Sequence, residues 1–337
     1  MAGGTQMKKV VLGFSGGVDS AVSATLLRDG GYEVIGMYLD NAGEDAKEDA
    51  VRTAEFIGIP LHIKDVHAEL EEKVCKRFTE AYLSGETPNP CIICNPTLKF
   101  SSLLDYANEI GADNIATGHY ARTENGCLYK GMPSNDQSYM LIRINRPQVE
   151  RLILPLGRFE KTQVRELALK LNLPVAQKPD SMEICFIPDK DYIGWLGKRV
   201  ELPKPGDFVF HGKKLGTHDG IHCYTVGQRR PGLYEEHKLY ISAINAETNE
   251  IELALWDELF KTEVKAAQFN WLCDKPTQPI RASVRVRHTK WENPDCTVYV
   301  EDDIVRIVCD DTVRAPARGQ SAVLYDGERV LGGGFII

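Results

Sequence analysis

The length, composition and charge of this 337-residue chain exclude several classes of protein. Hydrophobic residues make up 43% and charged residues 26%, close to the globular average, which excludes a collagenous, fibrous or disordered chain. No run approaches the roughly 18 apolar residues of a membrane helix, and Val10–Phe14 is too short for the core of a signal peptide. We therefore expect a cytoplasmic protein of two or three domains, without a membrane partner.

The cysteines and the charge pattern narrow the possible partners. Nine cysteines, an odd number spread widely along the chain, do not form a small disulfide framework; we expect thiols, metal ligands or catalytic groups. The net charge of −8 argues against a general coat for DNA or RNA. Residues 141–170 differ, because seven Lys and Arg there face three Glu, and such a stretch could contact RNA phosphates.

The first 120 residues alternate between apolar strands and helices. The patterns predict strands at 8–14, 32–39, 61–65 and 114–120, and helices at 21–29, 46–57, 70–82 and 103–110. The opening order of strand, helix and strand is a βαβ unit, which predicts a parallel sheet.

From Pro203 onward the pattern changes to short apolar runs separated by turn residues. The runs predicted as strands are 207–210, 240–244, 250–254, 282–288, 296–300, 304–309 and 322–325. This spacing is typical of small antiparallel barrels. We predict an α/β domain at 1–197, followed by two small, barrel-like antiparallel β domains at 198–262 and 263–337.

A glycine-rich string stands where the first strand meets the first helix. Ser15-Gly-Gly-Val-Asp-Ser20 can direct backbone N–H groups and a helix N-terminus at one anion, which predicts a phosphate cradle. The string lacks the Lys and Ser/Thr of a Walker loop, so transfer of a γ-phosphate is disfavoured. We expect Ser15 and Ser20 to hold pyrophosphate and Asp19 to position Mg²⁺. A plain strand-to-helix turn capped by Asp19 is the alternative.

Three cysteines stand in two short motifs. Cys91 and Cys94 lie in a proline-rich segment that would present them on a stiff loop ahead of a helix, and Cys185 follows much later. A Cys-x-x-Cys pair alone is typical of a redox couple or of half a zinc site. No cysteine or histidine near Cys185 offers the fourth ligand of a structural zinc site. A buried, inert pair of thiols is the remaining alternative.

Together these motifs resemble those of the tRNA-specific 2-thiouridylases of the ATP-pyrophosphatase superfamily. The other matching pieces run in family order and are Pro88-Asn-Pro90, Cys94-Asn95, Lys99-Phe100, Gly118-His-Tyr120, Asn135-Asp-Gln-Ser-Tyr139, Asp180-Ser181, Ile184-Cys-Phe-Ile187, Val226-Gly-Gln-Arg229, Gly319-Gln-Ser-Ala-Val323 and Leu331-Gly-Gly-Gly334. The resemblance implies a nucleotide-hydrolase-like N-terminal domain. It implies an ATP site formed by Gly13, Phe14, Ser15, Gly16, Gly17, Val18, Asp19, Ser20, Leu39 and Gly118.

The resemblance also implies a reaction. ATP adenylates the C2 oxygen of the wobble uridine, pyrophosphate leaves, a sulfur nucleophile attacks C2, and AMP departs. In the family's persulfide scheme, the residue aligned with Cys185 carries sulfur delivered by a partner protein, and the one aligned with Cys94 attacks it or forms a disulfide with it. Both roles require thiolates.

Cys91 departs from the family pattern, because many members have an Asp at this position that is a proposed acid or base. Thiolates at Cys91, Cys94 and Cys185 could instead hold three irons of a [4Fe–4S] cluster, with the fourth iron open to inorganic sulfide. Both sulfur routes stay open at this point.

The expected RNA partner is the anticodon stem-loop of tRNA, whose unstacked bases can be turned out for chemistry. The resemblance implies tRNA contacts at Asn89, Pro90, Cys91, His119, Asn135, Asp136, Gln137, Arg287, His288 and Gln320. Two other functions remain: a pyrophosphate-loop amidotransferase or ligase acting on a small molecule, and a nucleotide-binding sensor without catalysis. The three cysteines would have no task in the first of these.

Overall fold

The computed structural model describes residues 7–41, 44–180, 184–187, 189–230, 232, 237–288 and 293–337. Ser181, part of one matched motif, lies outside the described residues. The chain forms two compact units, and each is described by itself. The first comprises Met1–Lys73, Cys91–Pro188 and Glu328–Val330, and the second comprises Val74–Pro90, Asp189–Gly327 and Leu331–Ile337. No helix in the described part of the chain is long and apolar enough to cross a membrane.

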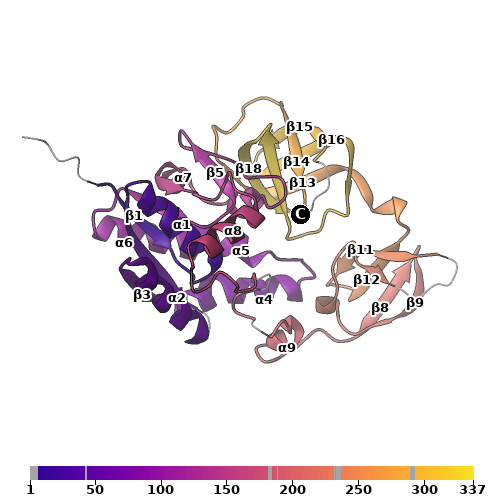
Figure 1. Cartoon of the computed structure of the whole chain (residues 1–337). Helices are drawn as coiled ribbons and strands as arrows, with labels where there is room; N and C mark the ends of the chain where they lie inside the picture. Colours follow the sequence, from indigo (N-terminus) through magenta and orange to yellow (C-terminus); the bar gives the residue numbers. More distant parts are fainter. Residues whose placement is uncertain are drawn as a thin grey trace, which may run out of the picture. The chain divides into compact units, whose positions relative to one another are not determined.

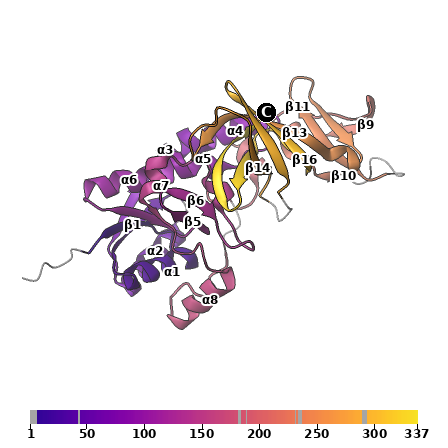
Figure 2. The ribbon, with the colours of Figure 1, turned by 90° about the horizontal axis from the view of Figure 1, so that it is seen from above.

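The first unit contains the predicted parallel sheet, in the order β3-β2-β1-β4-β7. Val10, Val11 and Leu12 of β1 are completely buried, because helices cover both faces of a parallel sheet. Figure 2 shows α1 and α2 on one side of β1 and α6 on the other. The bounds are β1 Lys9–Gly13, α1 Val18–Asp29, β2 Glu33–Asp40, α2 Glu44–Ile57, β3 Leu61–Asp65, β4 Asn114–Thr117 and β7 Leu152–Ile153.

A long helical stretch carries the two neighbouring cysteines. It consists of α5 (Pro90–Cys94), a π-helical turn η2 (Asn95–Lys99) and α6 (Phe100–Glu109), without a break. The prediction of a loop ahead of a helix was therefore wrong: Cys91 and Cys94 lie on the first turns of the helix itself. Pro90 suits a first helical position because its φ is already fixed. Pro96 has no N–H to donate, and the helix widens to a π turn there.

The other described elements of the first unit are a hairpin, three α-helices and two short helical turns. They are α3 (His67–Leu70), with the π turn η1 (Glu71–Cys75) continuing into the second unit, the antiparallel hairpin of β5 (Ala121–Glu124) and β6 (Cys127–Lys130), η3 (Ser138–Leu141), α7 (Arg146–Arg151) and α8 (Lys161–Lys170). Capping boxes begin α7 and α8, at Asn145 with Gln148 and at Glu160 with Gln163.

The second unit begins with α4 (Lys76–Leu83), which continues from η1, and later contains α9 (Tyr192–Gly197) and a five-stranded sheet (Figure 1). The sheet order is β10-β11-β12-β8-β9. Its strands are β8 (Gly206–Phe210), β9 (Lys213–His218), β10 (Arg229–Arg230), β11 (Leu239–Asn245) and β12 (Glu250–Ala254). The β12–β8 pair is parallel, the one exception among its pairings to the antiparallel arrangement predicted. Phe208 and Ile251 are fully buried between these strands.

The C-terminal strands close into a barrel. Strands β13, β16, β15, β14, β17 and β18 pair in that order, and β13 pairs again with β18. Their bounds are β13 Phe260–Trp271, β14 Ile280–Arg285, β15 Asp295–Glu301, β16 Ile304–Arg314, β17 Ser321–Asp326 and β18 Arg329–Ile336. The predicted α/β class with β-rich, barrel-like C-terminal parts is confirmed. The division at 198 and 263 stays a prediction.

Candidate functional site

The predicted phosphate loop lies at the carboxyl end of β1. Gly17 has extended backbone and forms the N-cap of α1, and no side chain caps this helix. The hydroxyl oxygens of Ser15 and Ser20 are 3.3 Å apart, and Ser20 Oγ donates to the Gly17 carbonyl at 3.0 Å. The N–H groups of a first helical turn have no partner within the helix, and the helix dipole favours negative charge there. The loop can therefore receive a phosphate group.

Two glycines allow the loop to take this shape. Gly16 has a φ of +69°, and a Cβ at this position would lie 2.6 Å from the backbone nitrogen of Ala50. Gly118, directly after β4, lies so close to α1 that a Cβ would come within 3.1 Å of Asp19 backbone. Leu39 lies next to the carboxyl end of β2, which neighbours β1. The structure thus gathers the predicted ATP-site residues at one edge of the parallel sheet.

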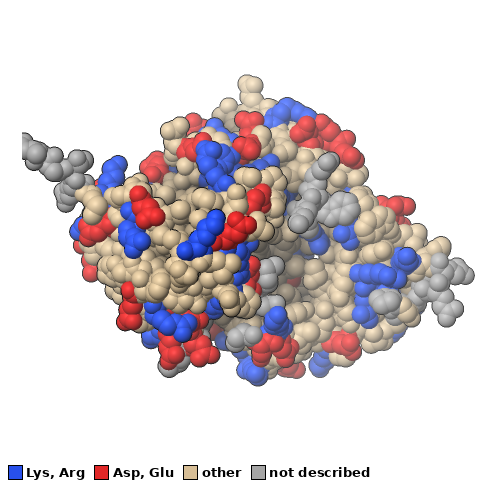
Figure 3. All heavy atoms as spheres, in the orientation of Figure 1, with Lys and Arg blue, Asp and Glu red and all other residues tan. Residues whose placement is uncertain are grey.

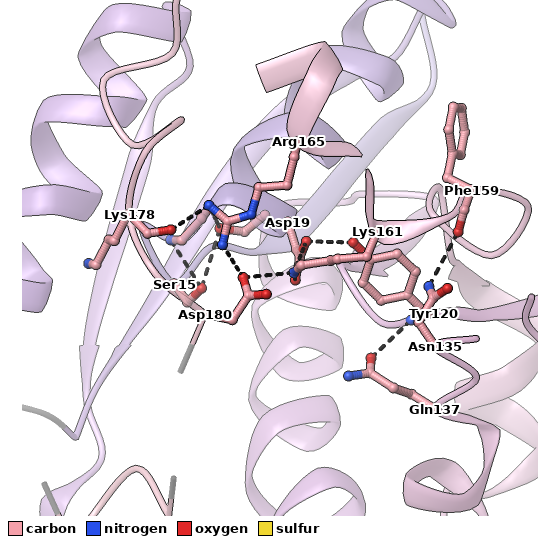
Figure 4. Close-up of polar contacts among 12 residues, drawn as sticks. Ser15, Asp19, Tyr120, Asn135, Gln137, Phe159, Lys161, Arg165, Lys178 and Asp180 are labelled. Atoms are coloured by element: carbon pink, nitrogen blue, oxygen red, sulfur yellow. Dashed lines mark hydrogen bonds and ion pairs between the residues drawn. The ribbon is translucent and has the colours of Figure 1, made fainter. Parts of the chain in front are cut away.

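Asp19 of the loop is held by a lysine from a distant helix. Lys161, the first residue of α8, places Nζ 2.8 Å from Oδ1 and 2.7 Å from Oδ2 of Asp19. The hydroxyl of Tyr120 donates to Oδ1 at 2.7 Å. Burial first, and then the bond to Asp19, raise the pKa of Tyr120 well above its ordinary value. Figure 4 shows the three side chains converging beside the start of α1.

The same lysine continues into a chain of ion pairs. Lys161 Nζ lies 3.0 Å from Asp180, which also accepts from Arg165 on the next turn of α8 (Figure 4). Desolvation raises the pKa of Asp180, but the bonds from Lys161 and Arg165 outweigh it, and the pKa lies below its usual range. Arg165 also donates to the Lys178 carbonyl. In the sequence, Lys161 and Arg165 stand out only as part of a basic stretch. The 142 positions between Asp19 and Lys161 leave no local motif that would link them.

The three predicted cysteines come together in the first unit. Each of the pairs Cys91–Cys94, Cys91–Cys185 and Cys94–Cys185 interacts electrostatically. Asn41, directly after β2, donates its side-chain N–H to Cys185 Sγ at 3.4 Å. Cys185 therefore lies at the carboxyl end of β2, next to the strand that carries the phosphate loop. All nine cysteines are thiols rather than disulfides.

Burial and mutual repulsion keep two of these thiols protonated. Desolvation raises the pKa of Cys94 to about 11; the charge of Lys99 lowers it, whereas Cys185 and Cys91 raise it further. Cys185 is exposed as a residue, but desolvation of its thiol, and then Cys91, raise its pKa as well. An added positive charge near these sulfurs would favour the thiolates that sulfur chemistry needs.

The charge of Lys99 acts on the thiols of Cys94 and Cys185 and lowers the pKa of each. This lysine lies on η2, one turn after Cys94, and donates to Asn95 Oδ1 at 3.0 Å. The buried Asn95 in turn donates to the Met140 carbonyl at 2.8 Å, which fixes the pair. His119 packs parallel to the ring of Phe100, and burial together with the charge of Lys99 holds its pKa well below the ordinary value. His119 is therefore neutral at pH 7.

The predicted tRNA contacts at 135–137 have structural partners. The buried carboxylate of Asp136 accepts from the backbone N–H groups of Gly131 and Ser138, at 2.8 and 3.0 Å. Gln137 accepts from the Tyr120 N–H at 3.0 Å, and Asn135 donates to the Phe159 carbonyl at 3.3 Å. These residues brace the loop that carries Tyr120 toward Asp19 (Figure 4). Their RNA contacts stay a prediction.

The remaining predicted RNA contacts lie in the second unit. Arg287, two residues after β14, donates to the Ala315 carbonyl and to the Val226 carbonyl, which ties it to the segment before β10. His288 is exposed. Gln320 donates its side-chain N–H to the Thr87 carbonyl at 2.7 Å. Figure 3 shows basic and acidic side chains intermixed on the visible face, without a large area of one sign.

The three thiols and Asp19 of the phosphate loop differ in the metal groups that they could hold. The described residues contain no cluster of three His, Cys, Asp or Glu side chains suited to a single metal ion. A four-iron cluster takes each cysteine on a different iron, so its thiols stand further apart than the ligands of one ion. Cys91, Cys94 and Cys185 interact in all pairs, and Cys94 and Cys185 are desolvated, which fits that arrangement. Asp19 has the oxygen ligands that Mg²⁺ prefers, once Lys161 moves away.

Comparison with known proteins places the chain in a family. A tRNA methyl transferase HUP domain matches residues 8–189, a tRNA methyl transferase PRC-barrel domain matches 196–254, and an aminomethyltransferase beta-barrel domain matches 261–336. The tRNA-specific 2-thiouridylase MnmA of Syntrophotalea carbinolica is 40% identical, covering 98% of both chains. That of Clostridioides difficile is 39% identical, again over 98% of both chains. A 4-thiouridine synthetase–RNA complex with bound ATP is 22% identical over 57% of this chain and 50% of that chain, with a TM-score of 0.36.

Proposed function

This chain belongs to the tRNA-specific 2-thiouridylase family, and on that premise we propose that it is the enzyme that thiolates C2 of the wobble uridine in tRNA, using ATP. The observation that carries the proposal is the position of the thiols Cys91, Cys94 and Cys185 in the unit that holds the phosphate loop. The hydrogen bond from Asn41 puts Cys185 at the carboxyl edge of the sheet, where the loop also lies, and Cys91 and Cys94 interact with Cys185 electrostatically.

The first step activates the base. The C2 oxygen of the uracil attacks the α-phosphorus of ATP, the bond to the β-phosphate breaks, and pyrophosphate leaves into the loop of Ser15 to Ser20. Activation is needed because a uracil carbonyl oxygen is a poor leaving group. Lys161 and the N-terminus of α1 supply the positive charge that the departing pyrophosphate requires. Asp19 would hold the Mg²⁺ that accompanies ATP, and Leu39 and Gly118 would contact the nucleoside.

The second step exchanges oxygen for sulfur. A sulfur nucleophile forms a bond to C2, the C2–O bond breaks, and the oxygen leaves as part of AMP. We propose that Cys91, Cys94 and Cys185 hold a [4Fe–4S] cluster, because Cys91 replaces the usual acid and interacts with both other thiols. When bound, such a cluster would supply a binding position for inorganic sulfide. A persulfide relay through Cys185 and Cys94, fed by a sulfur donor protein, is the competing outcome.

The RNA would be held by both units. We propose that the anticodon stem-loop contacts Asn89, Pro90, Cys91 and His119, with further contacts from the barrel. The three-part division at 198 and 263 would then correspond to one catalytic domain and two RNA-binding β domains. The abundance of reduced cysteines is consistent with a cytoplasmic enzyme.

The decisive experiment follows iron, sulfide and product together. The protein is purified anaerobically, its iron and acid-labile sulfide are measured, and thiolation of unmodified tRNA is measured with ATP and sulfide. The variants are Cys91→Ala and, as a matched control, Cys127→Ala, which removes a half-buried thiol of β6 outside the group of three. We expect Cys91→Ala to lose iron and activity, and Cys127→Ala to keep both.

Other results would point elsewhere. Full turnover by Cys91→Ala with a persulfide donor, and no iron in the wild type, would establish the relay. In that case a thiol reductant must reduce the disulfide formed between Cys94 and Cys185 back to two thiols after each turnover. A nucleotide sensor would release no pyrophosphate from ATP in the presence of unmodified tRNA. Release that requires a small acceptor and ammonia instead of tRNA would identify an amidotransferase.

A further inference from the structure

A turn of the C-terminal barrel holds the segment that leads into the cysteine helix. This segment, residues 84–89, connects α4 to α5. Both backbone groups of Thr87 are bonded to the turn that precedes β17: the N–H donates to the Arg318 carbonyl at 2.9 Å, and the carbonyl accepts from Gln320 Nε2 at 2.7 Å. Thr87, four positions before Cys91, is thus bound through both its N–H and its carbonyl.

The turn is shaped for this close approach. Gly319 has a φ of +82°, and a Cβ there would lie 2.9 Å from the Cβ of Glu86. Arg318 also lies 3.8 Å from the Glu86 carboxylate. The turn is anchored to β18 by two backbone bonds, from Gly319 N–H to the Ile336 carbonyl at 3.1 Å and from Ile336 N–H to the Gln320 carbonyl at 2.8 Å. These two bonds hold the turn on β18, so the turn binds Thr87 from a fixed position in the barrel.

The sequence after Thr87 transmits this hold to the cysteines. Pro88 and Pro90 each fix φ near −65°, and each also restricts the residue before it. The backbone between Thr87 and Cys91 consequently has few conformations left. A displacement of Thr87 would shift the N-terminal end of α5. Cys91 and Cys94 both lie in this first part of the long helix.

We propose that Gln320 is a positioning residue, which acts on Cys91 and Cys94 through Thr87. The inference rests on the proposed function, and it assigns to Gln320 a task other than direct contact with RNA. The side-chain amide of Gln320 donates the hydrogen bond to the Thr87 carbonyl. The proposed positioning of the cysteines depends on this bond. The barrel then contributes to catalysis by orienting the sulfur site.

The test separates positioning from RNA binding. Gln320→Met keeps the length of the side chain and removes the donor, and Gln320→Glu keeps the shape and replaces the donor with an acceptor. Gln268→Met is the matched control, because Gln268 is a barrel glutamine that accepts from Arg77 of α4, ahead of the segment that leads to the cysteines. Each variant is assayed by iodoacetamide labelling of Cys91 and Cys94 without ATP or tRNA, by tRNA affinity, and by single-turnover thiolation at saturating tRNA. Thermal unfolding checks that the barrel is intact.

We expect both Gln320 variants to label Cys94 about fivefold faster and to thiolate about tenfold more slowly, with tRNA affinity within about twofold of the wild type. The control should match the wild type in every assay. Weaker tRNA binding with unchanged labelling and unchanged single turnover would overturn the proposal and make Gln320 an RNA contact only. Unchanged values throughout would overturn it as well. The labelling assay needs neither ATP nor tRNA, so it remains decisive even if the wild type fails to thiolate tRNA.

Discussion

Lys161 Nζ contacts both carboxylate oxygens of Asp19, at 2.8 and 2.7 Å, although 142 residues separate the two positions. The phosphate loop has no lysine of its own, and α8 supplies the missing cation. Asp19 and Lys161 neutralise each other, with 31% and 28% of their side chains exposed. A phosphate group that enters the loop can take over Lys161 and leave Asp19 available for Mg²⁺.

Replacing this lysine should impair the activation step. In Lys161→Met we expect pyrophosphate release to fall about 100-fold, because a positioned cation at a developing charge contributes on that scale. The measurement is pyrophosphate formed from ATP with unmodified tRNA. Lys170→Met, at the exposed far end of the same helix, is the control and should stay within about twofold of the wild type. Equal rates in both variants would remove Lys161 from the site.

Two adjacent glycines should differ sharply in their tolerance of alanine. Gly16→Ala places a Cβ 2.6 Å from the backbone of Ala50 at a φ of +69°, whereas at Gly17 the Cβ would meet only Ser15 Oγ, at 3.4 Å. We expect Gly16→Ala to lower the free energy of unfolding by about 2 kcal/mol or more and to abolish ATP binding. Gly17→Ala should cost less than about 1 kcal/mol. Chemical denaturation and ATP titration measure both effects; similar losses in the two variants would contradict the geometry.

The reactivity of Cys94 should depend steeply on pH. Burial raises the pKa of its thiol to about 11, so the thiol is neutral at pH 7 and the thiolate fraction grows until the pH approaches that value. We expect the alkylation rate of Cys94 in the metal-free protein to rise about tenfold per pH unit from pH 8 to pH 10. Peptide mass spectrometry after timed iodoacetamide treatment gives the rate. A plateau below pH 9 would show that the thiol is less buried than the structure indicates.

Lys99 should tune the same thiol. Its charge lowers the pKa of Cys94 and partly offsets the effect of burial. Lys99→Met should therefore slow the alkylation of Cys94 at pH 8 by about threefold, without changing the rate at pH values above the pKa. Lys64→Met is the control, because Lys64 binds Ser102 of α6 and Glu69 and is not among the charges that act on this thiol. Faster alkylation in Lys99→Met would mean that the lysine acts by shielding the thiol from the reagent.

The sequence alone was sufficient for the local parts of this protein. The alternation of apolar strands and helices before residue 120 predicted the parallel sheet, because burial on both faces leaves a continuous apolar run in each strand. The glycines of the phosphate loop were recognisable because a strand-to-helix turn with Gly16 at positive φ accepts few other residues. The motifs also identified the family.

The tertiary structure decided how distant residues combine. It paired Lys161 with Asp19 and Gln320 with Thr87, contacts between residues 142 and 233 positions apart. It also brought Lys99 near enough to act electrostatically on Cys185, 86 positions later in the chain. It also moved Cys91 and Cys94 from a loop onto a helix, where Pro96 forces a π turn. Local sequence encodes backbone propensity and the pattern of burial. Long-range ion pairs and side-chain hydrogen bonds depend on which surfaces the packed fold brings together, and a short sequence pattern does not contain this information.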